Sequence, residues 1–349
     1  MIYRKKINNP KDKLKILIAP LDWGLGHVTR CIPIIRSLKN QNCDLILAAD
    51  EDTFLILKKE FPTLVILRLF GYKIKYSQDK KWLAFKLILQ LPKLAITISK
   101  EHRWLKAMIN IYHPDIVISD NRLGMHNNSI ISIYITHQLN IKTGNAIFDK
   151  IINTIHNSFI KKYDQCWVPD FKENGLAGDL SHPGKLKSNT VYLGALSRFE
   201  KLSVERKIYD LLISISGPEP QRTVFENMIF SQLKKNQKNV LVVRGLPAEK
   251  KKIEPPNSFI EIVNHLPAAE LNNAFLQSGI IICRSGYTTV MDLIKLQQKA
   301  IMVPTPGQVE QEYLATYLFE KEIYYSISQH EFLLCKFEVF INYLQIALF

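Results

Sequence analysis

Apolar and polar residues follow two rhythms along this chain. Short runs of β-branched and other apolar residues alternate with longer segments whose apolar residues recur with the period of a helix. Because parallel strands of one sheet need long, usually helical crossovers, the alternation predicts α/β units with parallel sheets. The predicted strands form a first series, 14–20, 43–49, 64–69, 115–119, 130–136 and 165–168, and a second series, 210–216, 240–243, 258–262, 279–283 and 300–303.

The two series are separated by residues 192–207, a run of mixed charge that has no clear period. We therefore predict an N-terminal domain over residues 1–196 and a C-terminal domain over 197–330. The remaining residues, 331–349, form an apolar tail that is a candidate for a helix returning to the N-terminal domain. A chain of 349 residues, 47% of them hydrophobic, can bury a core in each domain.

Composition excludes several classes of protein. The polar, basic first residues are not followed by an apolar signal segment, and no apolar run reaches the roughly 18 residues of a spanning helix, so we predict a cytoplasmic protein. The five cysteines are scattered and never form a CxxC pair, which fits neither a disulfide framework nor a zinc site. We expect no metal and no cofactor.

The net charge of +14 predicts an anionic partner. Much of this positive charge lies between Arg68 and Lys106, a segment with ten basic residues and only two acidic ones. The basic residues alternate with apolar side chains that include Trp82 and Trp104. Such a segment fits an interfacial helix on an anionic membrane surface, and it equally fits a core helix with a solvated basic face. No nucleic-acid motif accompanies it, so we expect no nucleic-acid partner.

Three glycine-containing turns connect a predicted strand to a predicted helix. The first contains Gly24 and Gly26 and ends at His27; the second contains Ser216 and Gly217; the third is Arg284-Ser285-Gly286. Free N–H groups at a helix start favour a phosphate. A helix start also disfavours imidazolium, so His27 is a candidate general base, although a surface histidine capping the helix is the alternative.

The third turn resembles the C-terminal domain of family 28 glycosyltransferases, which include the enzyme that adds N-acetylglucosamine to a lipid-linked peptidoglycan precursor. In that family a glutamate eight residues after the arginine binds ribose, and Asp292 has that spacing. The resemblance implies a GT-B fold, in which two Rossmann-like parallel-sheet domains face each other across a cleft.

Other motifs extend the resemblance over most of the chain. Gly26-His27 resembles the family's acceptor-side turn, and His137-Gln138 resembles a histidine-containing element after a later strand. Gln311-Glu312 occupies the place of a glutamine pair that contacts the donor sugar. Asp292 is shorter than the family's glutamate, and Glu312 stands where the family has an amide. The identity of the donor sugar therefore cannot be inferred from the family.

An Asp-x-Asp sequence, Asp50-Glu51-Asp52, has the form used by metal-dependent glycosyltransferases of another fold. It follows the second predicted strand, where an acidic loop is more often solvated or contacts ribose. The resemblance implies metal-independent transfer, in which helix N-termini and basic side chains balance the leaving-group charge.

These observations predict a hexosyltransferase that moves a sugar, with inversion, from a nucleotide diphosphate donor such as a UDP-sugar to a hydroxyl acceptor. A lipid-linked acceptor would place the enzyme on the inner face of the membrane, in cell-envelope synthesis. Two alternatives stay open: a nucleotide-sugar epimerase of the same shape, and a non-catalytic protein that binds nucleotide sugars.

Overall fold

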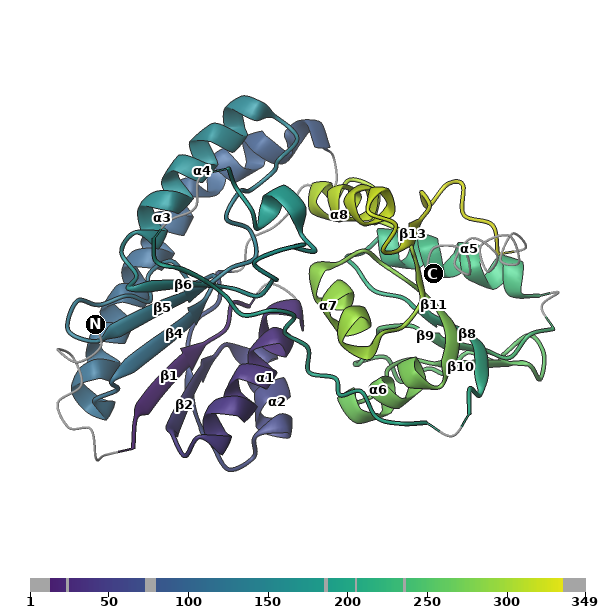
Figure 1. Ribbon diagram of the computed structural model, residues 1–349, viewed down its shortest axis with the longest axis horizontal. Coiled ribbons are helices and arrows are strands. Elements are labelled where there is room, and N and C mark those ends of the chain that lie inside the picture. The colour runs from purple at the N-terminus through teal and green to yellow at the C-terminus, as the bar shows by residue number, and fades with distance from the viewer. Residues whose placement is uncertain are drawn as a thin grey trace. The chain divides into compact units, whose positions relative to one another are not determined.

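The computed structural model describes residues 13–22, 25–72, 80–184, 188–204, 206–234 and 237–334. The chain divides into two compact units, Met1–Leu196 and Ser197–Phe349. Each unit is a parallel sheet with helices packed on it (Figure 1).

The described part of the first unit contains a seven-stranded parallel sheet in the order β3-β2-β1-β4-β5-β6-β7. The strand order runs outward from β1 in both directions, which is the doubly wound arrangement of Rossmann-like folds. The strands are β1 (Lys15–Ala19), β2 (Asp44–Ala49), β3 (Val65–Arg68), β4 (Ile116–Asp120), β5 (Ile131–Ile135), β6 (Gln165–Val168) and β7 (Thr190–Tyr192). The helices are α1 (Leu25–Asn40), α2 (Glu51–Glu60), α3 (Lys80–Tyr112) and α4 (Ala146–Ile160), with a short 3₁₀ helix at Gly178–Leu180.

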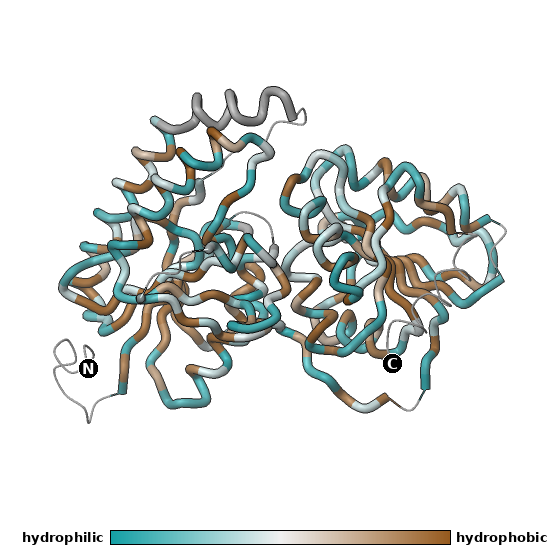
Figure 2. The backbone as a smooth tube through the Cα atoms, turned by 45° about the horizontal axis from the view of Figure 1, so that its top comes forward, coloured by the Kyte–Doolittle hydropathy of each residue, from teal (hydrophilic) through white to brown (hydrophobic). Residues whose placement is uncertain are grey.

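Both faces of this sheet are buried, and β1 shows why its sequence is apolar without interruption. Ile16 and Ile18 pack against residues of α1 and α2, whereas Leu17 and Ala19 pack on the opposite face with Leu105 of α3. Successive side chains of a strand point to opposite faces, so a sheet covered on both sides needs apolar residues at every position. Figure 2 accordingly shows hydrophobic residues concentrated in the strands of each unit.

The described part of the second unit repeats this plan with a six-stranded parallel sheet in the order β10-β9-β8-β11-β12-β13. The strands are β8 (Tyr209–Ser214), β9 (Val240–Val243), β10 (Ile260–Val263), β11 (Ser278–Cys283), β12 (Ala300–Met302) and β13 (Tyr325–Ser326). The helices are α5 (Gln221–Leu233), α6 (Ala268–Leu276), α7 (Tyr287–Leu296) and α8 (Val309–Glu320). A core of Leu211, Ile213, Phe225, Ile229 and Ile282 holds α5 against one face of the sheet.

All strands predicted from the sequence are present, and two further strands are added. β7 and β13 were missed because they are short edge strands, three and two residues long, that are too brief to show a period. The α/β class with two parallel sheets is therefore confirmed.

The connection between the units is fastened at both ends. On the first unit, the N–H groups of Leu193 and Gly194 donate to the carbonyls of Val168 and Asp170, both at 2.9 Å. On the second unit, the Ser197 hydroxyl donates to Asp292, 2.5 Å away.

The residues after Ser197 continue this attachment to the second unit. The Phe199 ring packs edge-on against Phe275. The Glu200 main chain exchanges two hydrogen bonds with the Asn272 amide, at 3.2 and 3.0 Å.

Two predicted features fall largely outside the described residues. Of the apolar tail, the structure describes residues 331–334, and the predicted returning helix lies beyond them. In the basic segment, residues 73–79 are not described, and side chains of α3 are described from Pro92 onward. No helix in the described part of the chain combines the length and the apolar character that crossing a membrane requires.

Candidate functional site

His27 lies in the first turn of α1, the helix that follows β1 along the chain. Gly24 is outside the described residues, and Gly26 belongs to the helix start. Nδ1 of His27 lies 2.9 Å from Oδ1 of Asp120, the last residue of β4. The His27 side chain is 14% exposed and that of Asp120 is fully buried.

Arg30, one helical turn after His27, joins these groups to a second histidine. Its Nε donates to Oδ2 of Asp120 at 2.5 Å, and its Nη2 contacts Oδ1 of the same carboxylate. Its Nη1 lies 2.9 Å from Nδ1 of His137, two residues beyond β5. The structure thus brings together His27 and His137, which the sequence had proposed separately.

Gln138 follows in the same loop, and its main-chain N–H donates to Oγ1 of Thr136 at 3.1 Å. This bond fixes the backbone of the loop just beyond His137. The predicted pair His137-Gln138 therefore lies at the carboxyl end of β5, beside the carboxyl end of β4 that carries Asp120.

Burial and neighbouring charge set the protonation of this cluster. Burial and the Arg30 guanidinium lower the pKa of His27 below 6.5, against the opposing effect of Asp120. Burial alone would raise the pKa of Asp120, but the guanidinium and His27 outweigh it and hold this pKa below its usual value. At neutral pH the cluster therefore holds a neutral His27 beside an ionised Asp120.

A second buried network supports the loop before the first glycine turn. The Arg122 guanidinium donates to the carbonyl of Pro20 at 2.7 Å and to Glu101 at 2.9 Å. Glu101 also accepts from the Tyr72 hydroxyl at 2.5 Å. Asp22 accepts from the Tyr72 N–H at 3.0 Å, so the chain enters the turn from a fixed position.

Asp50 has a structural role in the described structure. Its carboxylate caps α2 by accepting from the main-chain N–H of Thr53 at 3.1 Å. Among the described residues, no three His, Cys, Asp or Glu side chains are grouped to hold a metal ion.

On the second unit, the turn after β8 is open to solvent. Ser216 and Gly217 are exposed, and Gly217 has a φ of +106°, which a residue with a side chain adopts only under strain. A Cβ on Gly217 would lie 3.3 Å from Oγ1 of Thr305, so this turn borders the loop that follows β12. Oγ1 of Thr305 is buried and has no hydrogen-bond partner among the described residues.

Arg284 directly follows β11 and links several neighbouring segments of the second unit through hydrogen bonds. Its guanidinium donates to the carbonyls of Val303 at 3.1 Å and Gln221 at 3.1 Å, and to Oε1 of Gln329 at 2.8 Å. It also stacks over the Phe225 ring at 4.2 Å, and burial lowers its pKa to about 10. Arg284 is 1% exposed, so its contacts are to the protein rather than to a phosphate.

Ser285 and Gly286 lead into α7. The Ser285 hydroxyl donates to the carbonyl of Gln311 at 2.8 Å, and Gly286 is the N-cap. The alternative in which Ser285 caps this helix is therefore wrong, because its hydroxyl is turned toward α8. The first turn of α7 begins directly after Gly286, so its N–H groups lie at the carboxyl end of the sheet.

Asp292 and the pair Gln311-Glu312 brace neighbouring loops. Asp292 is 7% exposed, accepts from Ser197, and has its pKa raised to about 6 by burial. Oε1 of Gln311 accepts from the N–H of Thr305 at 3.0 Å, and Oε1 of Glu312 accepts from the N–H of Gly307 at 2.9 Å. These contacts shape the loop between β12 and α8.

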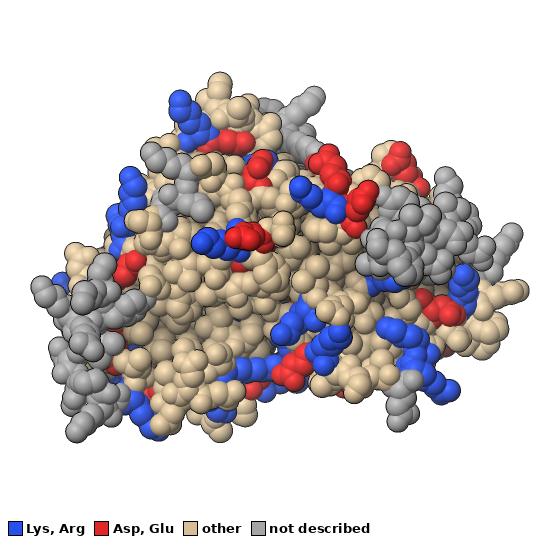
Figure 3. Space-filling model, viewed as in Figure 1, with Lys and Arg blue, Asp and Glu red and all other residues tan. Residues whose placement is uncertain are grey.

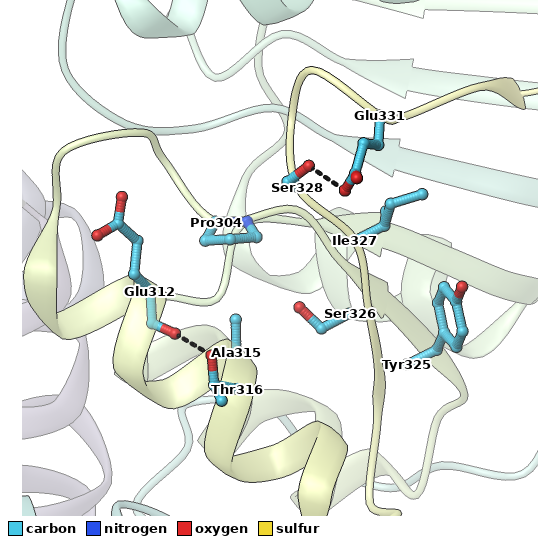
Figure 4. Close-up of a pocket in the computed structure, with 9 residues that line it drawn as sticks. All are labelled: Pro304, Glu312, Ala315, Thr316, Tyr325, Ser326, Ile327, Ser328 and Glu331. Atoms are coloured by element: carbon cyan, nitrogen blue, oxygen red, sulfur yellow. Dashed lines mark hydrogen bonds between the residues drawn. The ribbon is translucent and has the colours of Figure 1, made fainter.

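A hollow of about 530 Å³ lies beside this loop (Figure 4). It is bounded by Pro304 and α8 on one side and by β13 and the segment after it on the other, and hydroxyl groups line much of it. Its lining residues are Pro304, Glu312, Ala315, Thr316, Tyr325, Ser326, Ile327, Ser328 and Glu331. Of the predicted site residues, it includes Glu312 alone.

Sequence reasoning missed Asp120 and Arg30, although both carried a signal. Asp120 ends an apolar strand, and Arg30 directly precedes the apolar run 31–35 within α1. A charged residue inside an apolar pattern is normally paired when buried, and here the two pair with each other.

Comparison with known proteins was informative at the level of family and fold. Residues 222–338 match the family model of the Glycosyltransferase family 28 C-terminal domain. No curated protein matches the sequence.

Solved glycosyltransferases match nearly the whole chain in structure. The glycotransferase of kitacinnamycin aligns with a TM-score of 0.68 and 12% identity, covering 97% of this chain and 91% of its own. MurG of Acinetobacter baumannii aligns with a TM-score of 0.56 and 13% identity, covering 96% and 95%. UGT89C1 of Arabidopsis thaliana, complexed with UDP-L-rhamnose, aligns with a TM-score of 0.60 and 10% identity, covering 96% and 90%.

Identities this low show a shared fold, and the family match lies in the second unit, where the predicted donor-side motifs are found. The two findings agree on the class of enzyme. Residues 222–338 thus match a family 28 glycosyltransferase C-terminal domain, and the chain as a whole shares the GT-B fold of solved glycosyltransferases.

Proposed function

We propose that the enzyme transfers a sugar from a uridine diphosphate donor to a hydroxyl acceptor, with inversion at the anomeric carbon and without a metal ion. The observation that carries this proposal is the contact between His27 and Asp120 at the start of α1. A neutral histidine held by a buried carboxylate is the arrangement that a general base requires.

In this mechanism Nε2 of His27 takes the proton of the acceptor hydroxyl. The acceptor oxygen then bonds to the anomeric carbon from the face opposite the nucleotide, and the bond to the diphosphate oxygen breaks. The proton remains on the His27 ring, where Asp120 stabilises the imidazolium, and the electron pair leaves with the diphosphate. One displacement of this kind inverts the anomeric carbon.

The second unit supplies the groups for the donor. The exposed Gly217 turn and the start of α7 after Gly286 lie at the carboxyl ends of the adjacent strands β8 and β11. Helix-start N–H groups bind diphosphate and stabilise the leaving charge. Arg284 contributes by fixing these loops, and Asp292 is the candidate for the ribose hydroxyls.

The uridine assignment has two supports. The family resemblance of the Asp292 motif is one, and the shared fold of UGT89C1, solved with UDP-L-rhamnose, is the other.

The nature of the acceptor rests on the basic segment between Arg68 and Lys106. Its described part carries exposed Lys93, Lys100 and Arg103 beside Ile96, which is 55% exposed. We assign this surface to the anionic membrane leaflet and infer a lipid-linked acceptor.

The test begins with a thermal-shift screen of nucleotide diphosphate sugars, which should select uridine derivatives. The selected donor is then incubated with bacterial lipid extract, and the product linkage is read by proton NMR. An anomeric configuration opposite to that of the donor supports inversion, and a retained configuration contradicts it. Full activity in the presence of a chelator supports metal independence. A new sugar epimer formed from the donor alone would identify an epimerase instead.

A further inference from the structure

Two histidine rings contact the Arg30–Asp120 ion pair. Arg30 approaches Nδ1 of His137 at 2.9 Å and Nδ1 of His27 at 2.7 Å, and Asp120 approaches Nδ1 of His27 at 2.9 Å. The position of the proton on each ring follows from which groups can donate and which can only accept.

For His137 the assignment is direct. A guanidinium only donates hydrogen bonds, so Nδ1 of His137 must be the acceptor. A neutral imidazole carries one ring proton, and that proton is therefore on Nε2.

For His27 two groups compete for one nitrogen. If Nδ1 accepted from Arg30, its lone pair would also face the Asp120 oxygen, and two acceptors would be left in contact. If Nδ1 carries the proton, it donates to Asp120, and Nη2 of Arg30 must then direct its hydrogens to acceptors other than His27.

Nη2 of Arg30 does not need His27 as an acceptor. It has two hydrogens and contacts Oδ1 of Asp120. Its second acceptor, at 3.2 Å, is the amide oxygen of Asn121 when that amide is assigned from its hydrogen-bond partners. In this orientation the Asn121 nitrogen donates to Tyr134 at 3.1 Å and to Thr136 at 3.0 Å.

We propose that Arg30 is a positioning residue that fixes the two histidines in opposite tautomers, His27 protonated on Nδ1 and His137 on Nε2. The site then presents a proton acceptor, Nε2 of His27, and a hydrogen-bond donor, Nε2–H of His137. The catalytic use of this pair rests on the proposed function: His27 takes the hydroxyl proton, and His137 donates to an oxygen of the bound substrate. The tautomers themselves do not depend on that function.

The electrostatics of the cluster agree with this assignment. The groups facing His27 are Arg30, Asp120 and His137, and burial together with the guanidinium lowers the pKa of His27. The His27 ring is therefore neutral near pH 7, which is the condition under which its tautomer is defined.

The proposal is tested first on the wild-type protein. Two-bond proton–nitrogen NMR of the ring nitrogens distinguishes protonated from unprotonated positions, and His27→Gln and His137→Gln spectra assign the signals. We expect His27 with its proton on Nδ1 and His137 with its proton on Nε2. A proton on Nε2 of His27, or the same tautomer in both rings, overturns the proposal without any assumption about folding.

The second test uses Arg30→Lys, with Arg36→Lys as the matched control on the same helix. Arg36 is 40% exposed and pairs with Glu60. A lysine keeps the charge but cannot reach both Asp120 and His137 with a fixed fork. We expect a mixture of His137 tautomers and a fall in kcat of about 10- to 100-fold, with a smaller change in KM. Arg36→Lys should leave both unchanged, and unaltered tautomers and kcat in Arg30→Lys would contradict the proposal.

The tautomers and the catalytic role of His27 can be disproved separately. If His27→Gln keeps full activity while the wild-type tautomers are as expected, the proposed role of His27 as the base is wrong and the tautomer assignment stands. If His27→Gln is inactive and the tautomers differ, the role of Arg30 is wrong and the general base stands.

Discussion

His27 illustrates how burial and charge act together on one residue. Imidazolium is disfavoured by desolvation and by the nearby guanidinium, while Asp120 acts in the opposite direction. The net effect lowers the pKa of the ring below 6.5, so His27 is neutral at pH 7.

A pH profile of kcat/KM tests this protonation state. Protonation removes the base, so activity should fall on the acid side, with a midpoint below the ordinary pKa of 6.5. The His27→Gln variant should lower kcat by about 10²- to 10⁴-fold. His330→Gln, which removes an 82% exposed histidine, is the control and should leave the profile unchanged. An acid limb with a midpoint above 6.5 would contradict the lowered pKa.

Asp292 gives a second pH-dependent prediction. Burial raises its pKa to about 6, so the carboxyl group becomes neutral as the pH falls through that value. The neutral form is a weaker acceptor for ribose hydroxyls, and affinity for the UDP-sugar should decrease below about pH 6. Calorimetry of Asp292→Asn should show binding about tenfold weaker, because a hydrogen bond to a charged group is lost, and little change with pH.

The control for Asp292 is Asp179→Asn, since Asp179 is a 68% exposed carboxylate on the other unit. Its affinity should equal that of the wild type. Equal affinity of Asp292→Asn and the wild type would remove Asp292 from the donor site.

At the scale of elements, the second unit depends on one buried guanidinium. Arg284 directly follows β11 and ties it to the loop after β12 and to the first residue of α5. Three segments of the second unit therefore share one anchor.

Arg284→Lys should destabilise these elements together. A lysine has one nitrogen, which cannot reach the separated acceptors that Nη1 and Nη2 of Arg284 contact, and it has no planar group to stack on Phe225. We therefore expect the free energy of unfolding to fall by about 2–4 kcal/mol. Urea unfolding measures this change, and Arg36→Lys on the surface of α1 should change it by less than about 0.5 kcal/mol. Unchanged stability in Arg284→Lys would contradict the anchoring role.

The sequence predicted the strands because a sheet covered on both faces produces uninterrupted apolar runs, as β1 and β11 do. It also located the two glycine turns of the second unit, because a turn between strand and helix is a local feature. The pairing of His27 with Asp120 spans 93 positions, and no local pattern encodes a contact of that range. The burial of Arg284 was missed for a related reason: its acceptors are backbone carbonyls, which no side-chain motif reveals.

At the scale of the whole molecule, the charge of +14 is unevenly distributed along the sequence. On the face shown in Figure 3, basic and acidic side chains are interspersed. The described part of the basic segment contributes exposed cations on α3, and this helix is where a membrane contact should be sought.

Sedimentation with anionic liposomes tests that contact. Each basic residue near an anionic surface contributes about 1 kcal/mol, and salt screens this attraction. We expect the wild type to pellet at low salt and to be released at high salt, and the Lys93→Glu, Lys100→Glu, Arg103→Glu variant to remain in the supernatant. The control variant Lys250→Glu, Lys251→Glu, Lys252→Glu makes the same charge change in the second unit and should still pellet. A wild type that stays in solution at low salt contradicts membrane attachment.

The fastened connection between the units has a practical consequence for building hybrid enzymes. Ser197 is held by Asp292, Phe199 by Phe275 and Glu200 by Asn272. The three linker residues therefore belong to the second unit and must be transferred together with it. A recombination point placed between Gly194 and Ser197 preserves every one of these partnerships. A junction placed after Glu200 would set a foreign linker against Asp292 and so disturb the residue proposed to recognise the nucleotide. Donor preference should therefore be exchangeable between enzymes of this fold only when the linker is inherited from the donor-side parent.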